Sequence, residues 1–176
     1  SPCRSSPSPS GGCDMPYRVV VAGDRRLKDY ALVCAYLDRA LAARLPDVVV
    51  VSGAAAGADQ LGERYAADRG LAVERFPADW ATYGRAAGPV RNAAMALRAD
   101  AVVVFDGGGR GSADMIRQAK RQGLPLRVVP VAFKPGGELV RPGEPLPACP
   151  ACKRPLDRVK HCCWKCNWRA CEKCGQ

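Results

Sequence analysis

The chain has 176 residues, which is enough for one ordinary domain and a smaller second module. It is 48% hydrophobic but only 6% aromatic, and its apolar residues are largely Ala, Val and Leu, which suits helices packed on a parallel sheet. The net charge of +10 is spread without a dense basic block, so the favoured interpretation is a solvated basic surface. The alternative is a general attraction to polyanions or phosphorylated ligands. No apolar run reaches the roughly 20 residues of a membrane-spanning helix, so we expect no membrane partner.

The N-terminal segment, residues 1–14, consists mainly of Ser, Pro and Gly without apolar periodicity. Such a composition cannot bury enough apolar surface to fold, so we expect a disordered leader. Met15 stands directly before the first apolar run and could be the natural start. We therefore place the first domain at residues 15–134.

Within this domain, short β-branched runs alternate with longer helix-compatible segments, the pattern of repeated βα units. The sequence predicts strands near 17–22, 47–52, 71–76, 101–105 and 126–131. It predicts helices near 28–44, 58–69, 86–98 and 112–122. The expected fold class is α/β, a Rossmann-like parallel sheet of about five strands with helices on both faces. Residues 135–148 are rich in Pro and Gly and are expected to be a linker.

Three of the expected strands end in small or glycine-rich turns that open a helix. In an open parallel sheet, ligands bind at this edge, where backbone N–H groups and helix N-termini can hold an anion. A fourth stretch follows the third strand and supplies two arginines, suited to phosphate, and a tryptophan that could stack on a base. The alternative is that Asp79 caps a helix while Arg85 and Arg91 face water. The candidate ligand-binding residues are Gly23, Asp24, Arg25, Ser52, Gly53, Gly57, Asp59, Asp79, Trp80, Arg85, Arg91, Asn92, Asp106, Gly107, Gly111 and Ser112.

Four sequence blocks in this region together resemble the YspA, cpYpsA-related branch of the SLOG superfamily. They read GDRRLKDY, SGAAAGADQLGERYA, FPADWATYGRAAGPVRNAAMA and VVVFDGGGRGSADMIRQAKRQGLPLRVV. The resemblance implies a Rossmann-like domain that binds a nucleotide or nucleotide-derived ligand. Relatives in the superfamily include the Lonely Guy phosphoribohydrolases and the DNA-processing protein A family, which binds single-stranded DNA.

The fourth block departs from the phosphoribohydrolase motif P-G-G-x-G-T-x-x-E. Aligning its G-T pair on Gly111 and Ser112 places Met115 where the hydrolases have their glutamate. Asp114 is adjacent, but one residue along a helix rotates a side chain by about 100 degrees. The sequence therefore favours a binding role over catalysis, and no catalytic residue is assigned. Four aspartates could converge at the sheet edge and hold a ribose hydroxyl or Mg²⁺, although no specific motif marks them: Asp24, Asp59, Asp79 and Asp106. Helix capping would equally explain Asp59.

Seven of the ten cysteines lie in residues 149–176, in C-x-x-C spacings typical of a structural zinc ribbon. The favoured ligands are Cys149, Cys152, Cys163 and Cys166. Alternatively, Cys171 and Cys174 replace the second pair, or hold a second zinc with His161 or Cys162. Such thiolate sites favour a reducing cytoplasm over a secreted disulfide framework.

The leading functional interpretation is a module that binds or senses a nucleotide-derived ligand, with a zinc ribbon that contacts a protein or nucleic acid. A phosphoribohydrolase or nucleotidase is the second hypothesis, and a single-stranded nucleic-acid-binding protein resembling DNA-processing protein A is the third. A homo-oligomer is compatible with each.

Overall fold

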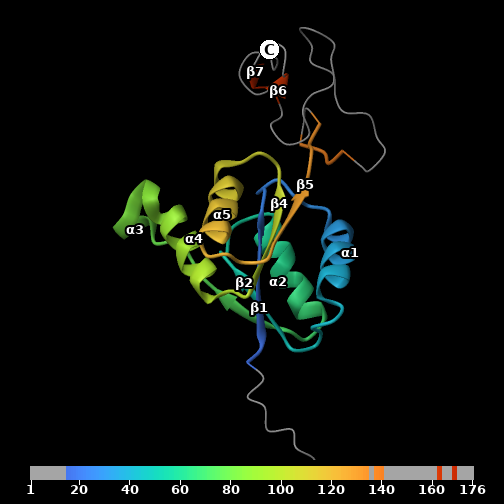
Figure 1. Cartoon of the computed structure of the whole chain (residues 1–176). Helices are drawn as coiled ribbons and strands as arrows, with labels where there is room; N and C mark the ends of the chain where they lie inside the picture. The colour runs from blue at the N-terminus through green and yellow to red at the C-terminus, as the bar shows by residue number, and fades with distance from the viewer. Residues whose placement is uncertain (1–14, 135–136, 141–161, 164–167, 170–176) are drawn as a thin grey trace, which may run out of the picture.

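The computed structural model describes residues 15–134, 137–140, 162–163 and 168–169. A five-stranded, all-parallel sheet with strand order β3-β2-β1-β4-β5 forms its centre (Figure 1). The strands are β1 (Tyr17–Gly23), β2 (Val48–Ser52), β3 (Ala72–Arg75), β4 (Ala101–Asp106) and β5 (Leu126–Pro130).

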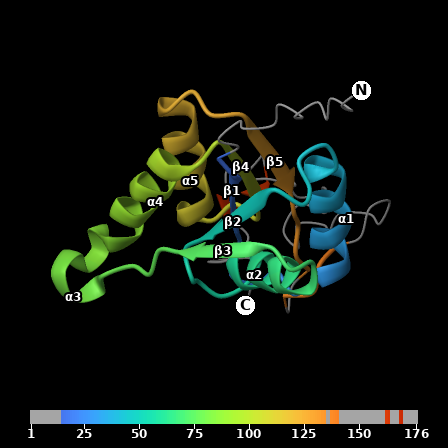
Figure 2. The ribbon, with the colours of Figure 1, turned by 90° about the horizontal axis from the view of Figure 1, so that it is seen from below.

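Helices cover both faces of this sheet, with α1 and α2 on one face and α4 and α5 on the other (Figure 2). Their bounds are α1 (Tyr30–Leu41), α2 (Ala58–Asp68), α4 (Ala87–Arg98) and α5 (Arg110–Arg121). The short helices α3 (Trp80–Tyr83) and η1 (Gly84–Ala86) precede α4. Figure 2 shows α3 beyond the N-terminal end of α4, projecting away from the sheet.

Alternation along the strands creates two separate cores. In β1, Val19 and Val21 are buried with α1 and α2, whereas Val20 and Ala22 are buried with α4 and α5. Apolar runs without polar interruption are the expected signature of strands that are covered on both faces. The two cores hold all five carboxyl-terminal strand ends at one edge of the sheet, which positions the connecting turns.

The structure confirms the predicted five-stranded α/β fold, and each strand boundary agrees with the expected one within one residue. The four longer helices are also present, whereas the sequence analysis missed α3. Within the expected linker 135–148, Leu139 forms a bridge with Phe133, and Val140 is buried. The rest of that linker, residues 135–136 and 141–148, lies outside the described residues.

In the tail, β6 (Cys162–Cys163) and β7 (Trp168–Arg169) form an antiparallel pair. The other expected zinc ligands lie outside the described residues. Across the described part of the chain, no helix is both long enough and apolar enough to cross a membrane.

Candidate functional site

The turn after β1 is closed by its own aspartate. The backbone N–H of Asp24 donates to the carbonyl oxygen of Phe105 at 2.9 Å, which joins the ends of β1 and β4. The Asp24 carboxylate accepts from the Arg26 backbone N–H at 2.8 Å and from its guanidinium at 2.9 Å. Arg25 is left exposed beside this pair. The first turn therefore offers an arginine, rather than a carboxylate, to a ligand.

The turn after β2 is held by hydrogen bonds of a buried serine at the end of the strand. Ser52 is completely buried, and its hydroxyl donates to Glu63 at 2.7 Å and accepts from the Ala54 N–H at 3.1 Å. Gly57, at φ +80°, ends the turn and lies against the backbone of Arg25, where a Cβ would lie 2.6 Å from its carbonyl carbon. Glycine is required there by both conformation and space. Gly57 and Ser52 thus shape the turn from inside the protein.

Arg91 reaches across from α4 to the same turn. Its guanidinium donates to the Gly53 carbonyl oxygen at 2.7 Å and to the Asn92 side-chain oxygen at 3.2 Å. A Cβ on Gly53 would lie 2.7 Å from Cζ of Arg91 and 2.8 Å from the Asp59 carboxylate. Glycine at position 53 therefore allows a cation and an anion to pack against the backbone together.

Burial raises the pKa of Asp59 to about 6, although Arg91 and backbone hydrogen bonds from Ala55 and Gly53 act in the opposite direction. Only 3% of this residue is exposed. Glu63, one turn further along α2, adds to the rise. Asp59 is thus a carboxyl group beneath the turn whose pKa is raised because it is buried.

These elements surround one hollow of about 380 Å³, which we call the Gly53 cavity. Two arginines, Arg25 and Arg91, line it, and Trp80 provides an aromatic wall that is 56% exposed. The remaining wall is made of small side chains and backbone: Gly53, Ala54, Ala55, Ala56, Pro77 and Ala78. Four of the lining residues, Arg25, Gly53, Trp80 and Arg91, were predicted from the sequence. The alanines and the proline were not among the predicted residues, because their side chains carry no chemical signal of their own.

Of the sixteen predicted contact residues, the twelve others lie outside the cavity lining, among them Asp79 and Arg85. Asp79 caps α3 by accepting from the Thr82 N–H at 3.0 Å, and hydrogen bonds from Thr82 lower the pKa of its carboxyl group. Arg85 is exposed on η1. Asp79 therefore caps a helix and Arg85 faces solvent, as the alternative interpretation expected. Arg91, in contrast, is hydrogen-bonded to the β2 turn.

The turn after β4 is likewise separate from the cavity. Asp106 is buried, and its carboxylate accepts from the Gly108 N–H at 2.9 Å. Gly107 packs against Asp24, whose Cγ would lie 2.8 Å from a Cβ at position 107. Ser112 is buried in the first turn of α5. Gly107 thus packs the β4 turn against the β1 turn, and none of these three residues lines the Gly53 cavity.

Asn92 connects α4 to α5. Its side-chain amide donates to Asp114 at 2.9 Å and to the carbonyl oxygen of Gly111 at 3.4 Å. Asp114 also accepts from Arg117 at 2.5 Å. Met115 is 1% exposed within the core between α5 and the sheet. The position aligned with the hydrolase glutamate is therefore a packing position in this protein.

A cluster of the four aspartates is not found. Across the described residues, no group of three or more His, Cys, Asp or Glu side chains lies close enough to hold a metal ion. Asp24 and Asp106 are occupied by the contacts above, Asp59 lies under the β2 turn, and Asp79 caps a separate helix.

The chain is similar in sequence to a known protein family and to a phage protein. The model of the YspA, cpYpsA-related SLOG family matches residues 17–83. The Gene 61 protein of Mycobacterium phage D29 is 34% identical over 116 residues, which cover 62% of this chain and 93% of the phage protein. The chain belongs to the YspA, cpYpsA-related SLOG family. The matched segment includes the β1 and β2 turns and Trp80.

Solved structures agree on the fold. DNA processing protein A from Streptococcus pneumoniae matches with a TM-score of 0.52 and 20% identity, over 66% of this chain and 50% of that protein. DNA processing protein A from Helicobacter pylori, studied for its single-stranded DNA binding mode, matches with a TM-score of 0.51 and 22% identity, over 65% of this chain and 66% of that protein. At these identities the likeness shows a shared Rossmann-like fold, and the chain spans only half to two thirds of these structures.

Proposed function

We propose that this member of the SLOG family binds a nucleotide-derived ligand in the Gly53 cavity, as a binding or sensing module. The observation that carries the proposal is the joint placement of Arg25, Arg91 and Trp80 around one small turn. A volume of about 380 Å³ lies within the 300–1,000 Å³ range that is usual for small-molecule sites. It suits a mononucleotide better than a larger dinucleotide.

Each part of a nucleotide has a matching group. Guanidinium groups pair with phosphate through planar, charge-assisted hydrogen bonds, which Arg25 and Arg91 can supply. The N-terminus of α2 follows the same turn and favours an anion through its backbone N–H groups and its dipole. Trp80 exposes a ring on which a base can stack. No carboxylate is among the residues that line the cavity, so a phosphate meets no like charge on its walls.

A phosphoribohydrolase is less well supported. Met115 occupies the aligned glutamate position and is buried, while the neighbouring Asp114 is bound by Asn92 and Arg117. Neither side chain lines the Gly53 cavity. Release of free base from nucleoside monophosphates by the purified chain would favour the enzyme instead.

The test is a thermal-unfolding panel of the full chain with the four common nucleoside monophosphates and adenosine. A ligand that binds only the folded state stabilises it by about 2.7 kcal/mol when its concentration is 100 times Kd. We expect a rise in Tm with at least one monophosphate and none with adenosine. Arg25→Met and Arg91→Met should each remove the rise, whereas Arg64→Met on the outer side of α2 should keep it. A panel without any rise in Tm would contradict the proposal.

We also propose that residues 149–176 hold a structural zinc ion and contact a partner. Cys163 is the last residue of β6 and pairs with Trp168 of β7, and Cys166 falls between the two strands in sequence. Strands on either side of a C-x-x-C pair fit the layout of a zinc knuckle, and a segment of this size needs metal to fold. Cys149 and Cys152 would complete a four-thiolate site that binds the ion without an open position for catalysis.

A further inference from the structure

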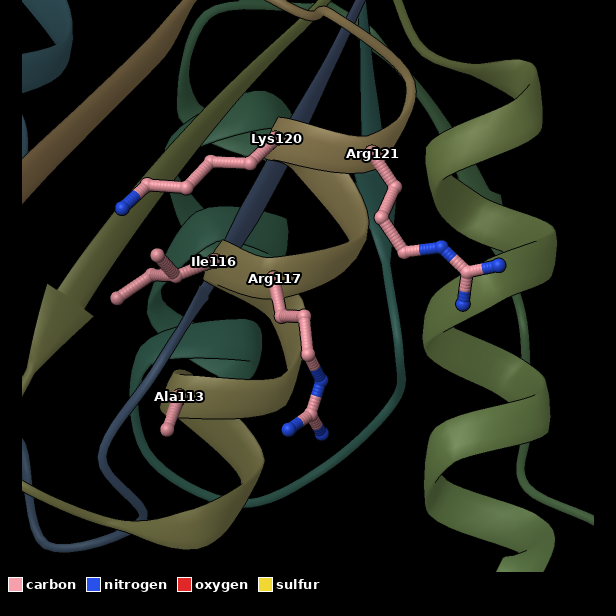
Figure 3. A pocket seen from close by; sticks show the side chains of 5 residues that line it. All are labelled: Ala113, Ile116, Arg117, Lys120 and Arg121. Atoms are coloured by element: carbon pink, nitrogen blue, oxygen red, sulfur yellow. The ribbon is translucent and has the colours of Figure 1, made fainter.

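The outer face of α5 carries a groove of about 470 Å³ that the proposed nucleotide site does not use. It is lined by Ala113, Ile116, Arg117, Lys120 and Arg121 (Figure 3). Figure 3 shows Lys120 and Arg121 leaving the last turn of the helix in opposite directions, with Arg117 one turn earlier. We call this surface, together with Arg110 at the start of the helix, the α5 basic face.

The α5 basic face has an uncompensated positive charge. The only acidic residue of the helix is Asp114, which is buried and paired with Arg117. In the part of the chain that the structure describes, Lys120 and Arg121 form no ion pair. On α2, by contrast, Arg64 is paired with Asp68 and Arg69 with Asp38.

Helix stability alone does not explain this charge pattern. Cations in the last turn are favourable at the negative end of a helix, which accounts for Lys120 and Arg121. Arg110, however, lies at the opposite end, where a cation is unfavourable. Arg117 is spaced three and four residues from Lys120 and Arg121, and like charges at these spacings repel. An external anion would relieve both effects.

The extent of the face indicates a polymer rather than a small anion. From Arg110 to Arg121 the helix rises by about 16 Å at about 1.5 Å per residue. In a DNA duplex each strand presents one phosphate per roughly 3.4 Å of helix axis, so several phosphates of one backbone fit along this length. No aromatic residue lines the groove, which leaves nothing for base stacking. We infer that the α5 basic face binds the phosphodiester backbone of a nucleic acid, without reading its sequence, at a site separate from the Gly53 cavity.

The experiment measures fluorescence anisotropy of a labelled 20-nucleotide oligothymidylate with the full chain over a range of salt concentrations. Wild type is expected to bind, with affinity falling as salt rises. Lys120→Glu with Arg121→Glu should lower the affinity at least tenfold at low salt and reduce the salt slope by about 1.4, because each lost phosphate contact on a single strand removes about 0.7. Lys120→Gln with Arg121→Gln should give a smaller loss in the same direction.

The matched control is Lys28→Glu with Arg39→Glu, which changes the net charge equally and also removes a cation from a last helical turn. It should change the affinity less than threefold, and all variants should keep the wild-type circular dichroism spectrum. No binding by wild type, or equal losses in both charge-reversal pairs, would overturn the inference. So would equal competition by polyglutamate, which would indicate an acidic protein partner. Loss of binding in Trp80→Ala, with retention in the α5 pair, would move the nucleic acid to the Gly53 cavity and overturn it as well.

Discussion

Replacing Asp59 with asparagine is expected to change the free energy of unfolding more favourably at neutral pH than in acid. Burial raises the pKa of this carboxyl group from 3.8 to about 6. At about 1.4 kcal/mol per pKa unit, this shift corresponds to on the order of 3 kcal/mol. The folded state favours the protonated form, so the stabilising contribution is fully present below pH 3.8 and is lost as the pH rises through about 6. Asparagine cannot ionise and escapes this loss.

Urea unfolding of wild type and Asp59→Asn, followed by circular dichroism between pH 4 and 7.5, measures the effect. The difference in free energy of unfolding, variant minus wild type, should increase by about 2.4 kcal/mol across this range, mostly between pH 4 and 6, because the unfolded carboxyl group is already partly ionised at pH 4. The charged groups near Asp59 are Arg91 and Glu63, and Glu63 is itself paired with Arg75 at 2.8 Å. Asp47→Asn, which removes a carboxylate from an exposed position, is the matched control. A constant difference for Asp59→Asn would refute the assignment of its raised pKa to the folded state.

Three other changes have defined outcomes. Trp80→Ala should weaken mononucleotide affinity at least tenfold in calorimetric titration, because base stacking contributes about 1–3 kcal/mol. It should alter stability by less than about 0.5 kcal/mol, because the ring is exposed. Tyr83→Ala, which changes another exposed aromatic residue outside the cavity, should leave the affinity unchanged. Gly57→Ala should lower the free energy of unfolding by more than about 1 kcal/mol in urea titration, since alanine is strained at φ +80° and meets the Arg25 backbone; an unchanged midpoint would contradict this. Elemental analysis should find one zinc per chain, or two if a second site forms, and Cys163→Ser should reduce the amount; an unchanged zinc content would exclude Cys163 as a ligand.

The sheet could be predicted closely because its signal is local. Four β-branched or apolar runs, such as 48–51 and 102–105, cannot be covered on both faces except in a parallel sheet between helices. Helix α3 was missed because four residues carry no periodicity, and only the Asp79 cap marks its start. The bridge between Phe133 and Leu139 was missed because proline and glycine concealed two apolar residues that pack on the core.

The sequence predicted which residue types form the candidate site better than it predicted how they are arranged. The glycine turns and the arginines could be recognised in the sequence, but hydrogen bonds between side chains and turns decide which of them are open to a ligand. Arg91 turns inward because the Gly53 carbonyl oxygen is within its reach, whereas Arg85 on η1 stays in solvent. Asp24 and Asp106 looked available and are held by Arg26 and by the Gly108 N–H. Such choices depend on contacts between distant segments, which local patterns do not record.

The backbone of Ala54 has a consequence for how the Gly53 cavity works. With φ at +53°, this alanine adopts the left-handed conformation that side chains of ordinary residues resist, at a cost of about 1–2 kcal/mol. The Ser52 hydroxyl holds it there through the Ala54 N–H. The free-energy cost of this backbone conformation is thus met during folding and not on ligand binding. A ligand that enters finds its wall already formed and loses little affinity to ordering it.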